Sequence, residues 1–266
     1  TGDYILLMDA DEYFVRGVEK LREYAEKEVN AVSCRIVEGD PVFNTYYRTR
    51  MWKNNNGWAF TGPGVHEVVV GPGDVVFDSG IQVIHDHSHR SPEDNAAVVA
   101  RFRGYVDILE GQLEENPKDQ RALFYLARTY KDLGQTFEAV DAYEEYLSID
   151  GNLFVDERWQ AAYDLAQVWK SQGEYQKAGE CCRRAIGIDP RRAEAYTLIG
   201  VINYNLGRWE DAIIFLRQAI SRSFPNDVVL FINPQEYHSI PADYLSLSLY
   251  KTKRFLEADF VAGGAL

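Results

Sequence analysis

The stretch that decides the fold of the C-terminal part reads A-Y-T-L-I-G-V-I-N-Y-N-L-G-R-W-E-D-A-I-I-F-L over residues 195–216. In it a small residue, Gly200, is followed by Gly207 and then by Ala212. The same spacing occurs twice earlier, as Ala127, Gly134, Ala139 and as Ala166, Gly173, Ala178. Small residues at fixed positions let two helices cross closely, so the pattern predicts repeated helix–turn–helix units.

The distances between these units identify the kind of repeat. The offset from Ala166 to Gly200 is 34 residues, the period of a tetratricopeptide repeat, and the offset from Ala127 to Ala166 adds five residues to it. A fourth unit can be aligned on Ser246 and Ala258, and it runs out at Leu266. We therefore expect a helical solenoid over residues 117–266, with three repeats and a partial fourth. Such arrays usually bind other molecules, and chemistry must come from elsewhere.

Residues 1–90 follow a different pattern, typical of an α/β domain. The run Tyr4–Met8 is continuously apolar, which predicts a strand buried on both faces. Helical spacing follows over residues 18–25, and β-rich segments cover residues 31–37, 46–53, 65–70 and 81–87. Ser91-Pro92 can open a helix that ends at Asn116, before Pro117, so residues 91–116 are expected to link the two parts.

The composition excludes several classes of protein. The chain has 28 basic and 41 acidic residues, so 28 − 41 gives a net charge of −13, which argues against nucleic-acid binding. Three cysteines are too few for a disulfide framework, and no apolar run is long enough to span a bilayer. We expect a cytoplasmic protein without a transmembrane segment, with peripheral attachment to an inner membrane as the alternative.

Two aspartates directly after the first apolar run are the strongest chemical signal. Asp9 and Asp11 are separated by one residue, and in an extended segment such side chains point to the same side. Paired carboxylates suit Mg²⁺ or Mn²⁺, which also hold diphosphate oxygens. The plain alternative is a solvated acidic turn at the end of a strand.

Four of the five histidines lie between residues 66 and 89. His85 follows the apolar Val83-Ile84, and a nitrogen ligand would complete a metal site with the two carboxylates. His87 and His89 suit a solvated strand end better. His66, beside Glu67, can be a core residue, a ligand or a phosphate contact, and the residues alone leave this open.

These residues resemble family 2 glycosyltransferases with the GT-A fold, which is Rossmann-like. The resemblance rests on the string Asp3–Glu12, on Arg50-Met51-Trp52, and on Trp58–Gly62 continuing to Val65-His66-Glu67. The order of a glycosyltransferase domain, a linking helix and tetratricopeptide repeats is also similar to that of a bacterial and phage-associated group. The resemblance implies that residues 1–90 are the C-terminal part of a GT-A domain.

The resemblance also implies roles for individual residues. Asp11, Asp9 and His85 would form the metal site under the diphosphate of a nucleotide sugar, and Glu67 would be the catalytic base. The remaining candidates would contact substrate: Gly62 and Gly64 in a loop beside the acceptor, His66, and the rings of Trp58 and Trp52. Transfer from a nucleotide sugar needs a cation to stabilise the leaving group and a carboxylate near the acceptor hydroxyl, so the residue types fit.

The function expected from the resemblance is metal-dependent, inverting transfer of a sugar from a nucleotide-diphosphate donor to a glycan or peptide acceptor. The repeats would bind the acceptor or a partner protein. In GT-A enzymes the half before the D-x-D segment binds the nucleotide base, so this chain alone is expected to be weakly active or inactive. Two alternatives stay open, an interaction scaffold with a degenerate glycosyltransferase remnant and a metal-dependent hydrolase using the histidine cluster.

Two further features concern the repeats. Residues 226–242 interrupt the 34-residue period and could line the binding surface, although a plain loop is the simpler expectation. Cys182 aligns with core positions of the other repeats, which predicts a packing role.

Overall fold

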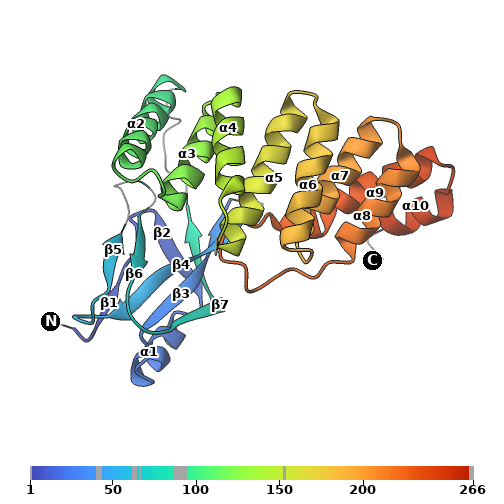
Figure 1. Cartoon of the computed structure of the whole chain (residues 1–266). Helices are drawn as coiled ribbons and strands as arrows, with labels where there is room; N and C mark the ends of the chain where they lie inside the picture. The colour runs from blue at the N-terminus through green and yellow to red at the C-terminus, as the bar shows by residue number, and fades with distance from the viewer. Residues whose placement is uncertain are drawn as a thin grey trace. The chain divides into compact units, whose positions relative to one another are not determined.

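The computed structural model describes residues 2–39, 44–61, 65, 67–86, 95–151 and 154–263 (Figure 1). They divide into two compact units. The sheet unit consists of Thr1–Leu133 together with Asn226–Ile232, and the repeat unit consists of Gly134–Pro225 and Asn233–Leu266. Each unit is described by itself below.

A five-stranded sheet forms the centre of the sheet unit, with the strand order β1-β4-β3-β7-β2. Its strands are β1 (Tyr4–Leu6), β2 (Glu12–Arg16), β3 (Ala31–Glu38), β4 (Asn44–Lys53) and β7 (Val75–His85). Only the β3–β7 pair is parallel among these pairings, and the other three are antiparallel. The strands expected over residues 31–37 and 46–53 are confirmed, and the last predicted strand begins earlier, at Val75.

The expectation of a doubly buried first strand is wrong. β1 lies at an edge of the sheet and pairs only with β4, and its Ile5 and Leu6 side chains are exposed. A short apolar run is compatible with an edge as well as with a centre, because composition does not reveal the number of neighbouring strands. The central strand is instead β3, where Val32, Cys34 and Ile36 are fully buried and alternate along one face.

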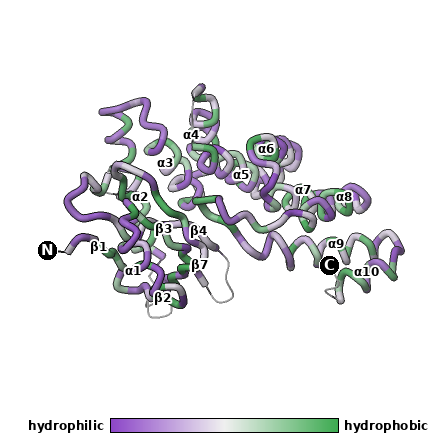
Figure 2. Tube along the Cα trace, turned by 90° about the horizontal axis from the view of Figure 1, so that it is seen from below, coloured by the Kyte–Doolittle hydropathy of each residue, from purple (hydrophilic) through white to green (hydrophobic). Residues whose placement is uncertain are grey.

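A helix covers that face of the sheet. α1 (Glu19–Glu26) contributes Leu21 to the same core as β3, and this confirms the helical pattern expected over residues 18–25. In Figure 2, hydrophobic (green) segments alternate with polar ones along β3 and β7, which supply most strand residues of this core. A separate two-stranded sheet pairs β5 (Ala59–Thr61) with β6 (Val68–Val70).

Two longer helices complete the sheet unit. α2 (Asn95–Glu115) lies within the helix expected over residues 91–116, of which positions 91–94 lie outside the described residues. It packs on α3 (Gln120–Asp132), whose N-terminus is capped by the Asp119 carboxylate accepting from the Ala122 amide at 2.9 Å.

Every element that the structure describes in the repeat unit is a helix, as the sequence predicts. Its helices are α4 (Thr136–Ser148), α5 (Val155–Ser171), α6 (Tyr175–Ile188), α7 (Glu194–Asn205), α8 (Trp209–Ile220), the 3₁₀ helix η1 (Pro234–Tyr237), α9 (Ser239–Lys251) and α10 (Phe255–Ala262). Successive pairs α5–α6, α7–α8 and α9–α10 pack against each other along the chain (Figure 1).

The small residues do what their spacing predicts. A Cβ atom at Gly200 would lie 2.5 Å from Leu216 Cγ, so α7 and α8 approach each other where a side chain would not fit. The turn glycines Gly134, Gly173 and Gly207 have φ of 72°, 76° and 73°, the left-handed conformation that favours glycine. Cys182 is fully buried, in agreement with a packing role.

Residues 226–242 are not a plain loop. Residues 226–232 lie against β4, where the Thr45 amide donates to the Ile232 carbonyl at 2.8 Å and the Ile232 amide donates back at 2.9 Å. In the repeat unit, Tyr237 is buried and its hydroxyl donates to Glu194 Oε2 of α7 at 2.9 Å. The segment therefore lines the repeats through one half and extends the sheet through the other.

Candidate functional site

The segment of Asp9 and Asp11 is a turn between β1 and β2. The Glu12 amide donates to the Asp9 carbonyl at 3.1 Å, which closes a four-residue turn. The predicted convergence of the two aspartates assumed an extended chain, and that assumption is wrong. As a result the two carboxylates contact different partners.

Asp9 faces two arginines of β4. Its Oδ2 atom lies 3.3 Å from both Arg48 Nη1 and Arg50 Nη2. Arg50 is fully buried and also pairs with the buried Glu12 carboxylate. A buried guanidinium needs such compensation, because an unpaired charge in the interior costs several kcal/mol. Arg50 Nε has no hydrogen-bond partner among the described residues.

Asp11 faces His85 at the end of β7. Asp11 Oδ2 lies 3.2 Å from His85 Nε2, and Glu38 Oε1 lies 3.6 Å from His85 Nδ1. Antiparallel pairing of β2 with β7 places Glu12 opposite His85, and this register brings Asp11 beside the ring. The predicted Asp11–His85 pair is therefore in contact.

This pair supplies two adjacent donors of the kinds that divalent cations accept, one carboxylate oxygen and one imidazole nitrogen. The described residues contain no group of three or more histidine, cysteine, aspartate or glutamate side chains placed to hold a metal ion. The Asp9 carboxylate faces Arg48 and Arg50 instead. Of the predicted metal ligands, only Asp11 and His85 are therefore placed to bind the same ion.

A cavity of about 450 Å³ opens on the face of the sheet opposite α1. We call it the sheet cavity. Its floor contains Ser33, whose hydroxyl lies 2.9 Å from that of Thr49. Two of the predicted site residues that the structure describes line it, Asp9 and the exposed Glu67. The other described residues of the lining are Leu7, Tyr47, Arg48, Thr49, Arg50, Phe60, Val68, Val69, Val75, Phe77 and Val229. The structure therefore brings Asp9 and Glu67 to one cavity.

The tryptophans have different environments. Trp52 is only 4% exposed and packs edge-to-face on Phe60, with ring centroids 6.2 Å apart, so it is a core residue and does not offer a face to a sugar. Trp58 packs directly on the backbone of Gly71, where a Cβ atom would lie 2.3 Å from its ring. The other predicted residues, Gly62, Gly64 and His66, and the cluster members His87 and His89, lie outside the described residues.

Three of the lining residues that were not predicted from the sequence are Arg48, Arg50 and Val229. Arg48 and Arg50 alternate along β4, and this spacing, which puts two charges on one face of a strand, was a usable signal. Val229 comes from the segment that returns from the repeats to β4, where the Tyr47 amide donates to its carbonyl at 2.9 Å. No local sequence pattern predicts a contact between residues so far apart in the chain.

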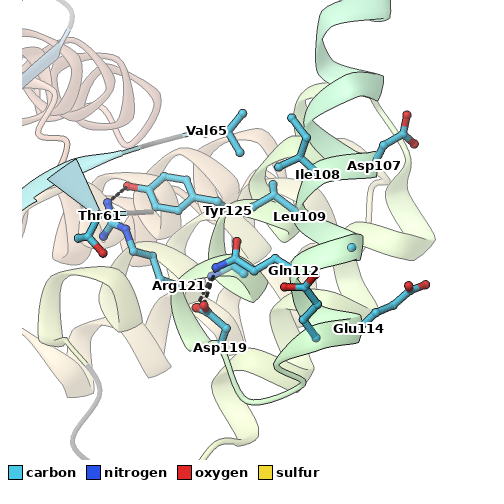
Figure 3. A pocket seen from close by; sticks show the side chains of 13 residues that line it. Thr61, Val65, Asp107, Ile108, Leu109, Gln112, Glu114, Asp119, Arg121 and Tyr125 are labelled. Carbon is cyan, nitrogen blue, oxygen red and sulfur yellow. Dashed lines mark hydrogen bonds between the residues drawn. The ribbon is translucent and has the colours of Figure 1, made fainter. Parts of the chain in front are cut away.

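A second cavity, of about 750 Å³, lies between β5, α2 and α3 (Figure 3). Asp119 is at its edge, where its second oxygen accepts from Gln112 Nε2 at 2.6 Å, and Arg121 Nη2 donates to the Tyr125 hydroxyl at 3.2 Å. None of the predicted site residues that the structure describes is among the lining of this cavity. The cavity is lined by four acidic side chains, those of Asp107, Glu114, Glu115 and Asp119. One of them, Asp119, already serves as the N-cap of α3.

Comparison with known families identifies the C-terminal part. Models of the tetratricopeptide repeat match residues 121–151, 160–192 and 183–228. The chain therefore carries tetratricopeptide repeats after a mixed β-sheet region. No helix in the described ranges combines the length and the apolar composition that a bilayer span requires.

Solved structures agree at the level of the fold. One crystal structure of MamA is 21% identical with a TM-score of 0.52, and covers 66% of this chain and 94% of its own. A second, of MamA protein, is also 21% identical with a TM-score of 0.51, and covers 65% of this chain and 85% of its own. No curated protein matches the chain. These comparisons support the repeats and give no support to a GT-A domain.

Proposed function

We propose that the chain is an interaction scaffold whose repeat array binds a protein partner. The observation that carries this is the array itself, because stacked helical pairs form extended surfaces that are used for binding. A polar groove of about 550 Å³ between α6 and α7 offers a place for such contact. Arg183, Asn203 and Arg208 lie along it with Glu174 and Gln176.

Charge reversal in this groove tests the scaffold function. Partners co-purified with the wild-type chain should be lost with the double variant Arg183→Glu and Arg208→Glu, because two favourable contacts become repulsive. The double variant Arg101→Glu and Arg103→Glu on α2 changes the net charge equally and should retain them. A partner set that is identical for all three chains would contradict the proposal.

The second candidate function is metal-dependent transfer of a sugar from a nucleotide-diphosphate donor to a glycan or peptide acceptor. Two contacts favour it, the 3.2 Å approach of Asp11 to His85 and the placement of Asp9 and Glu67 on one cavity. Asp11 and His85 would hold Mn²⁺ or Mg²⁺, which neutralises the charge of a departing diphosphate when bound. Glu67, exposed at the cavity, would accept the proton of the acceptor hydroxyl.

Binding of Mn²⁺ in the absence of substrate distinguishes this candidate from a scaffold that has no enzymatic activity. Calorimetric titration of the chain with Mn²⁺ should show one site, weakened roughly tenfold or more by Asp11→Ala and by His85→Ala, since each removes a ligand. The control Asp107→Ala, at the second cavity, should bind as the wild type does.

Glu67→Gln then tests the base. It should retain Mn²⁺ binding and lower the rate of sugar transfer, which is expected to be weak for this chain alone, by roughly a hundredfold or more, as expected for a general base. Absence of Mn²⁺ binding, or binding that Asp11→Ala leaves unchanged, would rule out the metal-dependent reaction.

A further inference from the structure

The short helix η1 lies on a face of the repeat helices and is anchored there by its last two residues. Tyr237 is only 1% exposed, its ring packs on that of Phe224 with centroids 5.2 Å apart, and its hydroxyl donates to Glu194 Oε2 at 2.9 Å. Thr197 Oγ1, one turn further along α7, donates to the Glu236 carbonyl at 3.3 Å. α7 therefore holds η1 through both a side chain and the main chain.

α7 shows how completely this face is covered. Every residue from Glu194 to Asn203 is buried, so the helix has no side open to solvent over this length. α6, α8 and α9 pack on α7, and η1 covers the side that carries Glu194 and Thr197. Polar side chains of a helix normally mark its solvent side. Glu194 and Thr197 thus mark a side that would be open if η1 were displaced.

The covered face continues onto α5. In the 34-residue register, Gln160 and Tyr163 of α5 are equivalent to Glu194 and Thr197 of α7. Burial raises the pKa of Tyr163 and the nearby Glu236 adds to the rise, so Glu236 lies close to α5 as well as to α7. η1 therefore crosses equivalent positions of two successive first helices, as a bound peptide does on the extended surface of a solenoid.

Glu236 fits this face poorly. Burial and the neighbouring Glu194 raise the pKa of Glu236 to about 7, and its Oε2 atom has no hydrogen-bond partner among the residues that the structure describes. An amide side chain of the same shape brings no charge into the face and can donate a hydrogen bond as well as accept one. Glutamine should therefore bind at this position more tightly than the glutamate that the chain itself supplies.

We propose that this face of α5 and α7 is a peptide-binding site, that Asn233–Tyr237 is its resident occupant, and that its partner is a peptide with an amide side chain directly before a tyrosine. The partner's tyrosine takes the pocket of Tyr237, because a buried aromatic anchor supplies much of the affinity of such contacts. Its amide takes the place of Glu236. This surface is additional to the groove between α6 and α7, and the proposal does not depend on that groove.

Binding of a labelled peptide tests the proposal. A fluorescein-labelled peptide of residues 230–241 with Glu236→Gln is titrated with the full chain, and its fluorescence anisotropy is measured. The wild-type chain should bind it weakly, because the resident segment competes at an effective concentration on the order of millimolar. Tyr237→Ala in the chain, which we call the opened chain, loses the resident anchor and should bind the peptide roughly tenfold or more tightly than the wild type. The matched control Tyr250→Ala, at a position of α9 that is 62% exposed, should bind as the wild type does.

Changes in the peptide and in the face test the chemistry of the partner. At pH 8 the peptide that keeps glutamate at position 236 should bind the opened chain roughly fivefold or more weakly than the Glu236→Gln peptide, because a charge is then buried. Tyr237→Ala in the peptide should weaken binding roughly tenfold or more. Thr197→Val, added to the opened chain, should weaken it roughly threefold or more, since the donor to the peptide carbonyl is lost.

Circular dichroism establishes whether the opened chain is folded. If it is not, Tyr237→Phe decides, because it removes only the hydrogen bond to Glu194 and should bind the peptide roughly threefold or more tightly than the wild type. The proposal is overturned if the folded variant binds the peptide no better than the wild type, or if the glutamate and glutamine peptides bind alike. Peptide binding that persists when Arg183→Glu and Arg208→Glu are added, while co-purified partners are lost, distinguishes this site from the groove between α6 and α7.

Discussion

At the scale of single residues, Asp78 joins α1 to the sheet. It lies on β7 and its carboxylate accepts from the Gly80 amide at 2.7 Å, from Tyr24 at 3.0 Å and from Lys20 at 3.1 Å. Burial by itself would raise the pKa of Asp78, but these hydrogen bonds outweigh it and hold the pKa below its ordinary value. The ionised carboxylate therefore stabilises the folded sheet unit.

We expect Asp78→Asn to lower the free energy of unfolding by roughly 1–3 kcal/mol at neutral pH, because the charge-assisted hydrogen bonds are lost. A depressed pKa contributes stability above the ordinary value for aspartate, about 4, and loses it as the pH falls through the folded-state value. The difference between wild type and variant in urea unfolding should therefore shrink in acid. Asp74→Asn, at an exposed position, is the control and should change stability by no more than about 0.5 kcal/mol.

Glu236 has the opposite behaviour. Burial raises its pKa from 4.5 to about 7, and the neighbouring Glu194 adds to the rise. Its Oε2 atom has no hydrogen-bond partner within the described part of the chain. The folded repeat unit thus holds a proton that the unfolded chain releases at lower pH.

Stability from this proton is complete below pH 4.5 and is lost as the pH rises through about 7. Glu236→Gln, which cannot ionise, should remove that loss and be more stable than the wild type at pH 8, by on the order of 1–3 kcal/mol. Urea unfolding at several pH values measures it. The same change at the exposed Glu138 should leave the pH profile unaltered, and a Glu236→Gln profile as steep as that of the wild type would contradict the assignment.

At the scale of elements, the turns between paired helices show how far the repeat register extends. Gly134, Gly173 and Gly207 take a left-handed conformation, and Lys253 occupies the equivalent position of the last repeat with a φ of 64°. A side chain in this conformation is strained by about 1 kcal/mol or more. The fourth repeat therefore has the same left-handed turn as the other repeats, but with lysine in place of glycine.

Lys253→Gly should raise the stability of the repeat unit by about 1 kcal/mol, because glycine relieves this strain. Lys251→Gly is the matched control: Lys251 is the last residue of α9 and has no left-handed conformation to relieve, so glycine there should leave stability unchanged or lower it by up to about 1 kcal/mol. Chemical denaturation of both variants compares them directly. Two variants that shift stability in the same direction would show that the conformation of residue 253 carries no strain.

The elements also show what a sequence can reveal. β3 and the repeat helices were predictable because their side chains alternate or recur with the period of the element. The edge position of β1 and the turn at Asp9 were not, because both depend on which strands become neighbours. For the candidate site, the Asp11–His85 contact agrees with the residues chosen from the sequence, whereas Arg50 takes Asp9 away from the expected pair.

At the scale of the whole molecule, the least predictable feature is the return of residues 226–232 to β4. They follow α8 and precede α9, yet they contact the sheet unit through Ile232 and Val229 and supply a wall of the sheet cavity. A pairing between segments more than 180 residues apart leaves no periodic trace in either of them. In sequence the segment lies between the repeat helices α8 and α9, whereas in the structure it lies beside β4.

Hydrogen exchange can distinguish these two kinds of neighbour. Because the core around β3 and the core around α8 and α9 are separate, a lesion in one should loosen that unit alone. In Asp78→Asn, the Ile232 amide, which donates to Thr45 at 2.9 Å, should exchange faster together with the amides of β4, while α8 and α9 exchange as in the wild type.

Gly200→Ala provides the reciprocal lesion. The new methyl group would overlap Leu216, and overpacking of this kind costs roughly 1–3 kcal/mol. The helices α7 and α8 should then exchange faster, while Ile232 and β4 keep their protection. If the exchange rate of the Ile232 amide instead changed together with that of α8 in both variants, residues 226–232 would be stabilised by the repeats. The wall that they form in the sheet cavity would then not be held by the sheet.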